Sequence, residues 1–281
     1  MKQYIECLRI PHYIKNLICF FPLFFNGSLF QIGLFINCTI GFFVLCLISS
    51  AVYIFNDIHD KDRDKLHRSK NKRPVAAGTV SIRHAYMLAG LLVMISATVC
   101  LVSGLSGKAA ICLGIYTLIN VFYTIYGKHR PILDILCLSS GYPLRLLYGG
   151  FLCGIKVSSW LFLTVLCLSL FMGIGKRRGE FIEENAGNTR PVLEQYSLTW
   201  INGQMYFMLG LGIVFYSLWA IEKSSQLVYS IPIVLVITMY YNLLILKDDE
   251  GDPVSTVLGN KLLVLIIVLY IMCMFVSLYL L

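Results

Sequence analysis

Apolar segments close to twenty residues long recur along the whole chain, from about residue 15 to the C-terminus. A helix needs about 20 apolar residues to cross the hydrocarbon core of a bilayer. Hydrophobic residues make up 58% of the 281 residues and charged residues only 14%, whereas soluble domains average about 45–50% and about 25%. Lipid cannot form hydrogen bonds with backbone N–H and C=O groups, so these groups must bond within the segment, and helices are expected. The chain is therefore predicted to be an integral, multi-pass membrane protein of all-α fold.

Nine membrane spans are predicted, and no soluble domain is left over, so residues 1–281 are expected to form a single transmembrane domain. The first span is the weakest, because Pro22 and the pair Asn26-Gly27 interrupt it. The predicted spans cover about residues 15–31, 33–56, 82–104, 107–127, 131–154, 157–175, 198–221, 226–246 and 262–281.

Lysines and arginines are distributed unequally between the two sides of these spans. The N-terminal segment and the loops after the second, fourth, sixth and eighth spans hold eighteen of the 23, and the other loops hold three. Cytoplasmic loops carry the excess of Lys and Arg. The N-terminus and the long polar loops are therefore predicted to face the cytoplasm at the plasma membrane, with the C-terminus outside. This topology accounts for the distribution of the net charge of +8, so no nucleic-acid partner is expected.

A strongly polar stretch, NDIHDKDRDKLHRSKNKR, follows the second span. If the helix continues to about residue 66, one carboxamide and three carboxylates fall within about 100° around its axis: Asn56, Asp57, Asp60 and Asp64. Asp62 lies on the other side. Oxygen ligands of this kind suit Mg²⁺, which usually binds through one or two carboxylates and substrate phosphates. The alternative is a solvated helix whose acids pair with its own lysines and arginines.

Basic residues near this stretch are candidates for binding an anionic substrate. Lys72 and Arg73 close the polar stretch and can supply cations to a polyanion. Lys15 and Asn16 stand where the first span begins. They either contact a lipid phosphate or anchor the chain at the membrane interface, as snorkelling lysines do.

The fifth predicted span contains two ionisable residues, Asp134 and Arg145. They share a helix face but lie about 16 Å apart along the axis at 1.5 Å per residue, so each needs another partner. A charge inside a membrane is costly and normally faces a partner or a polar cavity. The two residues therefore either lock helices together or line a cavity that holds a charged ligand.

Lys176 and Arg177 directly follow the apolar run of the sixth span. Cations at this position are the usual cytoplasmic flank of a membrane helix. They are equally placed to bind a substrate phosphate, and the sequence leaves both interpretations open.

Taken together, these residues resemble the UbiA-type prenyltransferase superfamily. The resemblance covers nearly the whole chain: the nine spans, N-D-x-x-D-x-x-x-D at Asn56–Asp64, and K-R-P at Lys72–Pro74. Within it, the chain is most similar to decaprenyl-phosphate phosphoribosyltransferases, on R-x-x-x-x-I-K-N at Arg9–Asn16, Tyr126–Gly150, G-K-R at Gly175–Arg177 and L-E-x-Y at Leu193–Tyr196. The resemblance implies helices around a central cavity that opens to the cytoplasm.

One departure from the wider superfamily bears on the substrate. Members that use prenyl diphosphates carry a second aspartate motif, often D-x-x-x-D, whereas here Leu138 stands four residues after Asp134. The chain has additional bases instead, among them Lys128 and Arg145. Fewer acids and more bases suit a donor that carries a further phosphate beyond its metal-bound diphosphate. Phosphoribosyl diphosphate has such a group, its 5-phosphate.

The first hypothesis is an Mg²⁺-dependent transferase that moves 5-phosphoribosyl from phosphoribosyl diphosphate to a polyprenyl, decaprenyl-type phosphate at the bilayer. Its proposed metal ligands are Asp57, Asp60 and Asp64, and its catalytic candidates are Asp57, Asp60 and Asp134. Its substrate-binding candidates are Lys15, Asn16, Asn56, Lys72, Arg73, Lys128, Arg145, Lys176 and Arg177.

Two other hypotheses remain at this point. The first keeps the fold and moves a polyprenyl group from its diphosphate to an aromatic or other small acceptor, with acids of the loops after the sixth and eighth spans replacing the second aspartate motif. The second is a transporter whose aspartates bind coupling ions. Transporter sites usually lie near the bilayer midplane between repeats, whereas these acids gather at one membrane surface.

Overall fold

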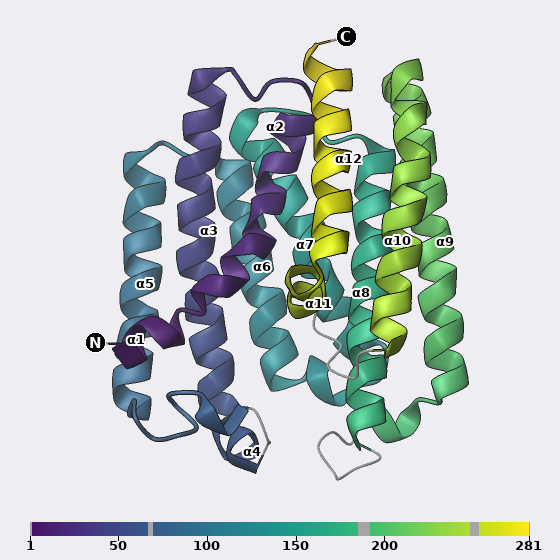
Figure 1. Ribbon diagram of the computed structural model, residues 1–281. Helices are drawn as coiled ribbons and strands as arrows, with labels where there is room; N and C mark the ends of the chain where they lie inside the picture. Colours follow the sequence, from purple (N-terminus) through teal and green to yellow (C-terminus); the bar gives the residue numbers. More distant parts are fainter. Residues whose placement is uncertain (1, 67–69, 185–191, 248–252, 281) are drawn as a thin grey trace. The chain divides into compact units, whose positions relative to one another are not determined.

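The computed structural model describes residues 2–66, 70–184, 192–247 and 253–280 (Figure 1). Every regular element in these ranges is a helix, which confirms the predicted all-α class. The acidic cluster expected after the eighth span, residues 248–252, lies outside the described ranges.

The chain divides into two compact units. The first unit contains residues 1–24, 28–133 and 144–156, and the second contains residues 25–27, 134–143 and 157–281. The helix α2 (Phe21–Phe25) and the helix α7 (Leu133–Cys153) contribute to both units. The expectation of a single domain over 1–281 and of a central cavity stays a prediction.

In the first unit, α3 is the central helix and packs against α5 and α6 (Figure 1). Buried side chains of α3, among them Val44, Leu45 and Ile48, meet Tyr116 of α6 and Tyr148 of α7 in one apolar core. The elements of this unit are α1 (Lys2–Cys7), η1 (Ile10–Phe20), α3 (Ile32–His59), α4 (Lys61–Leu66), η2 (Lys70–Lys72), α5 (Ile82–Val102), α6 (Gly107–Ile125) and η3 (Gly127–His129).

In the second unit, α8 and α9 pack along each other's length (Figure 1). Phe171 and Ile174 of α8 meet Met205 of α9, Ile245 of α10 and Leu263 of α12 in a second apolar core. The elements are α8 (Ser159–Glu184), η4 (Leu193–Gln195), α9 (Leu198–Lys223), η5 (Ser225–Ser230), α10 (Ile231–Lys247), α11 (Pro253–Gly259) and α12 (Lys261–Tyr279).

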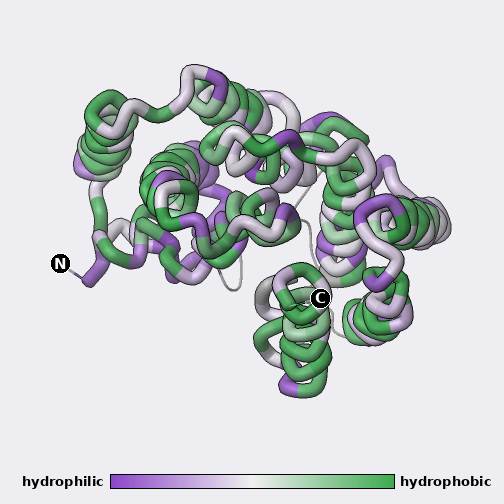
Figure 2. The backbone as a smooth tube through the Cα atoms, turned by 90° about the horizontal axis from the view of Figure 1, so that it is seen from above, coloured by the Kyte–Doolittle hydropathy of each residue, from purple (hydrophilic) through white to green (hydrophobic). Residues whose placement is uncertain are grey.

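Seven helical segments of the described ranges are long and apolar enough to cross a membrane. Hydrophobic residues dominate the course of these helices (Figure 2), and many of them are exposed, such as Met94 and Leu101 on α5. Such apolar exposure suits a bilayer and would be a liability in water. The chain is therefore an integral membrane protein. Its seven candidate spans are Ile32–His59, Ile82–Val102, Gly107–Ile125, Ser159–Ile182, Leu198–Lys223, Ser225–Leu246 and Lys261–Tyr279.

The two other predicted spans differ from these seven, so the count of nine is not confirmed. The first is a shorter apolar stretch, Ile10–Phe25, in which an unusually long 3₁₀ segment precedes a single α-helical turn. It ends before Gly27, whose φ of 77° turns the chain. The fifth predicted span is the helix α7, which has 21 residues but carries Asp134, Pro143 and Arg145.

Gly149 on α7 allows η1 to approach α7 closely, as expected for a glycine in a packed membrane helix. A Cβ atom at this position would lie 1.8 Å from the backbone oxygen of Cys19, and backbone cannot rotate away as a side chain can. Gly149→Ala is therefore expected to lower the free energy of unfolding by about 1–3 kcal/mol, the usual cost of overpacking. The measurement is thermal unfolding of the purified protein in detergent. Gly114→Ala on α6, with open space around it, is the control, and an equal effect of both would contradict the prediction.

Candidate active site

The polar stretch after α3 forms two short helical pieces that keep the aspartates in register. The helix α3 ends at His59, and Asp60 caps it with a backbone N–H bond to the Asn56 carbonyl. The helix α4 then begins, and the Asp64 N–H bonds to the Asp60 carbonyl at 2.7 Å. The chain therefore keeps the helical progression through the junction.

In this geometry, Asp62 lies on the opposite face of the helix from the other aspartates, as the helical period predicts. Asp57 and Asp64 are buried, each with 4% of its surface exposed. Asp62 points away, with 92% of its side chain exposed, and pairs with Lys65. Three carboxylates of the motif therefore face the protein, and the fourth faces the surroundings.

Three cations of the first unit contact the inward carboxylates. One guanidinium nitrogen of Arg73, Nη1, lies 3.1 Å from Asp57 Oδ1 and 2.6 Å from Asp64 Oδ2. Lys128 on η3 donates from Nζ to Asp60 Oδ1 at 2.6 Å. The third cation is Arg9, which pairs with Asp57. We call these six residues the aspartate cluster: Arg9, Asp57, Asp60, Asp64, Arg73 and Lys128.

Arg9 is the member of the aspartate cluster that was not predicted as a site residue. Its guanidinium pairs with the Asp57 carboxylate and lies 5.1 Å from the centroid of the Tyr53 ring. Burial lowers the pKa of the Arg9 guanidinium, and the Asp57 carboxylate opposes that shift. Its φ of 52° is left-handed, a conformation that costs a non-glycine residue about 1–3 kcal/mol and is common at functional sites. The sequence signal for Arg9 is its position at the start of R-x-x-x-x-I-K-N, a motif that carries the family resemblance but does not by itself indicate a contact with the aspartates.

The remaining candidates of the polar stretch and N-terminal segment have different surroundings. Asn56 is half-buried, and its Oδ1 lies 3.2 Å from the Thr124 hydroxyl of α6. Lys72 is exposed on η2, and Lys15 is half-buried on η1. Thr124 therefore helps to orient the carboxamide that begins the motif.

The aspartate cluster has the chemistry of a cation site. Among the described residues, no three side chains of His, Cys, Asp or Glu group into a metal site by themselves. The carboxylates of the cluster contact Arg9, Arg73 and Lys128 instead. Nevertheless, one positively charged nitrogen already bridges oxygens of Asp57 and Asp64. Carboxylate oxygens are the hard ligands that divalent ions such as Mg²⁺ prefer, so Asp57 and Asp64 have the chemistry to hold the predicted Mg²⁺.

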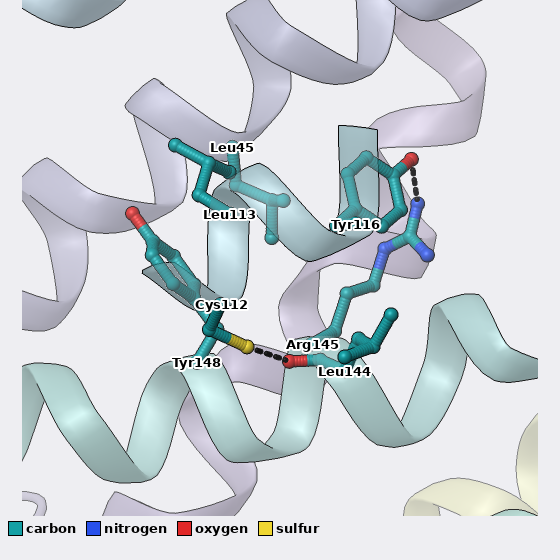
Figure 3. A pocket seen from close by; sticks show the side chains of 7 residues that line it. All are labelled: Leu45, Cys112, Leu113, Tyr116, Leu144, Arg145 and Tyr148. Carbon is teal, nitrogen blue, oxygen red and sulfur yellow. Dashed lines mark hydrogen bonds between the residues drawn. The ribbon is translucent and has the colours of Figure 1, made fainter. Parts of the chain in front are cut away.

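Arg145 on α7 belongs to a second polar group in the first unit. Its Nε donates to Asn16 Oδ1 at 2.7 Å, and its Nη2 donates to the Tyr116 hydroxyl at 3.0 Å. Ser49 of α3 contacts both Asn16 and Tyr116. Figure 3 shows Arg145 and Tyr116 beside a narrow pocket with otherwise mainly apolar walls. Arg145 thus ties η1 to α6 and α7.

Asp134 has protein partners in the second unit, where both of its carboxylate oxygens are engaged. Arg177 donates from Nε to Asp134 Oδ2 at 2.6 Å, and the Tyr196 hydroxyl donates to Asp134 Oδ1 at 2.7 Å. The side chains of Asp134 and Arg177 are fully buried, and Arg177 also pairs with Glu180. The prediction that Asp134 needs a partner other than Arg145 is confirmed, and protein side chains supply that partner.

The predicted site residues thus fall into three groups. Asp57, Asp60, Asp64, Arg73 and Lys128 meet in the aspartate cluster, and Asn16 meets Arg145 elsewhere in the first unit. In the second unit, Asp134 meets Arg177, and Lys176 is half-buried on α8. Tyr196, which the sequence indicates only as part of the L-E-x-Y motif, is a direct partner of Asp134.

Comparisons with known proteins agree with the sequence resemblance. The family model described as the UbiA prenyltransferase family matches residues 17–262. The decaprenyl-phosphate phosphoribosyltransferase of Corynebacterium glutamicum is 28% identical, over 98% of this chain and 86% of that protein. The protein of the same name from Mycolicibacterium smegmatis is 33% identical, over 78% of this chain and 70% of that protein.

The fold is shared with solved structures. A UbiA homolog from Archaeoglobus fulgidus, bound to GPP and Mg²⁺, superimposes with a TM-score of 0.75 over 98% of this chain and 99% of that chain. Because the two sequences are only 16% identical, this likeness shows a shared fold and nothing further. The family match covers most of the sequence, and it includes the motif that builds the aspartate cluster. The chain therefore belongs to the UbiA prenyltransferase family and is a membrane-embedded transferase.

Proposed function

We propose that this transferase moves the 5-phosphoribosyl group of phosphoribosyl diphosphate to a polyprenyl phosphate, with Mg²⁺ as cofactor. The observation that carries the proposal is the aspartate cluster, in which three carboxylates and three cations lie in direct contact. Such a mixture suits a metal-bound diphosphate, because carboxylates hold the metal and cations hold phosphate oxygens. The names of the two relatives given above support this choice of donor and acceptor.

Asp57, Asp60 and Asp64 would hold the Mg²⁺. When bound there, the ion neutralises charge on the leaving diphosphate. Asn56, oriented by Thr124, and the cations Arg73 and Lys128 would bind diphosphate oxygens. The cations would do so by exchanging their carboxylate partners for phosphate.

The reaction breaks the bond between the anomeric carbon of ribose and the diphosphate oxygen, and it forms a bond from that carbon to an oxygen of the lipid phosphate. Diphosphate leaves with the bonding electron pair. A lipid phosphate is already anionic near pH 7, because the second pKa of such esters is about 6. The proposed chemistry therefore needs no separate general base.

Two further predicted substrate ligands keep that role in the proposal. Lys15 on η1 would contact the lipid phosphate, and Lys176 on α8 would contact a phosphate of the donor. The contacts of three other residues favour positioning roles instead, since Arg145 joins helices of the first unit and Arg177 and Tyr196 engage both oxygens of Asp134.

The test is a transfer assay with purified protein in detergent or in vesicles. Phosphoribosyl diphosphate labelled in the ribose, polyprenyl phosphate and Mg²⁺ are expected to yield a labelled lipid, and EDTA is expected to abolish that product. Prenyl transfer from a polyprenyl diphosphate to an aromatic acceptor is the alternative within the family. Labelled product from the prenyl donor alone would refute the proposed donor and leave the family assignment unchanged.

A further inference from the structure

The aspartate cluster is electrically balanced by the chain's own residues. Its three carboxylates carry three formal negative charges, and Arg9, Arg73 and Lys128 carry three positive charges. The six side chains are largely shielded, with side-chain exposures from 5% for Asp57 to 26% for Arg73. Charges in such surroundings interact more strongly than charges in open water.

This balance opposes the binding of a divalent cation by itself. The carboxylates that would hold the ion, Asp57 and Asp64, each already have one oxygen in contact with Arg73. A metal ion would therefore compete with the guanidinium for these carboxylates. The displaced guanidinium would carry an unpaired charge close to the metal, and like charges at this separation disfavour each other.

The balance also opposes the binding of a diphosphate by itself. Its oxygens would approach the inward carboxylates, and the three cations of the aspartate cluster are already paired with those carboxylates. When the metal and the diphosphate bind together, each lowers the electrostatic cost of binding the other. Asp57 and Asp64 would then hold the metal, and the Arg73 guanidinium would bind phosphate oxygens, which it binds as readily as carboxylate.

Arg73 is the residue best placed to make this exchange. It is the only one of the three cations, among the described residues, seen to bridge two carboxylates. It is also the most exposed, at 26% compared with 17% for Arg9 and 8% for Lys128. It follows the short η2 segment rather than lying within a long helix.

We propose that Arg73 couples the binding of the metal to the binding of the diphosphate, by holding Asp57 and Asp64 until a diphosphate accepts its guanidinium. Metal alone and diphosphate alone then bind weakly, and each raises the affinity for the other by the same factor, as linkage requires. The inference rests on the proposed function only in that the donor carries a diphosphate. It holds equally for a phosphoribosyl and a prenyl donor.

The experiment measures binding to the full-length protein in detergent micelles, without turnover. Mn²⁺ binding is followed by electron paramagnetic resonance without a diphosphate, and binding of labelled inorganic pyrophosphate is followed by equilibrium dialysis in Mn²⁺ and in EDTA. For the unchanged protein, we expect pyrophosphate affinity to rise roughly tenfold or more when Mn²⁺ is present. Equal affinity in Mn²⁺ and in EDTA would overturn the proposal, and this comparison requires no variant to fold.

Arg73→Gln is expected to shift the two affinities in opposite directions. Mn²⁺ alone should bind more tightly, because the carboxylates lose their competitor, and pyrophosphate in the presence of Mn²⁺ should bind more weakly. Chelation of Mn²⁺ by free pyrophosphate is the same for every variant, so it cancels in the comparison. Lys65→Gln is the matched control, since Lys65 pairs with the outward Asp62, and it should change neither affinity.

Weaker binding of Mn²⁺ alone to Arg73→Gln would overturn the proposal, because it would mean that Arg73 supports the metal site. This failure is distinct from failure of the proposed function. The transfer assay decides between phosphoribosyl and prenyl donors, whereas the binding experiment uses only the metal and pyrophosphate.

Discussion

Asp57→Asn is expected to lower kcat of the transfer reaction by about 100-fold or more. Loss of one preorganised electrostatic contact in an active site usually has an effect of this size. The substitution removes a carboxylate that contacts both Arg9 and Arg73 and that is a proposed ligand of Mg²⁺. The amide keeps the shape of the side chain but cannot neutralise these cations or a metal. The measurement is the initial rate of lipid labelling from phosphoribosyl diphosphate at saturating Mg²⁺.

Asp62→Asn is the matched control, because it makes the same chemical change in the same motif on the outward face. Asp62 pairs only with Lys65 among the described residues, and its side chain is 92% exposed. Its kcat should remain that of the unchanged protein. Asp60→Asn repeats the test at a carboxylate whose cation partner is Lys128. Full activity of both Asp57→Asn and Asp60→Asn would remove the aspartate cluster from the mechanism.

Breaking the buried ion pair of the second unit is expected to destabilise the protein by about 3–5 kcal/mol, the usual cost of leaving a buried charge without its partner. Arg177→Met leaves the fully buried Asp134 carboxylate with Tyr196 as its remaining described partner. The measurement is the free energy of unfolding of the purified protein in detergent.

The double variant Asp134→Leu with Arg177→Met removes both charges and is expected to recover most of the stability. A buried ion pair often contributes little more to the free energy of unfolding than apolar residues of similar size. Asp62→Asn, which breaks an exposed pair, serves again as the control and should leave stability unchanged. If Arg177→Met is as stable as the unchanged protein, the pair is not a structural support. The role predicted for Arg177 in phosphate binding would then be favoured.

The helices could be predicted largely from apolar length, because the bilayer imposes the same length on each one. The helix α3 at Ile32–His59 begins and ends within a few residues of the predicted span. The helix α8 is longer than predicted and continues to Glu184, because hydropathy marks only the part in lipid. Residues such as Lys176, Arg177 and Glu180 extend it, since they are good helix formers.

The acidic face could also be predicted, because it depends only on local helical periodicity. Its cations could not be predicted in the same way. Arg9 lies 48 positions from Asp57 in the sequence, and Lys128 lies 68 positions from Asp60. Arg9 also requires a left-handed backbone, which no local pattern indicates for an arginine.

The sequence by itself determined that this chain spans a membrane as a helical protein, which family it belongs to, and which aspartates share a face. Those properties depend on composition, on short motifs and on the period of a helix. Only the tertiary structure decided which charge meets which: Arg73 between Asp57 and Asp64, Lys128 on Asp60, and Arg177 on Asp134. A charge buried near lipid must find a partner to offset its lost hydration, and packing between distant segments determines which partner is within reach.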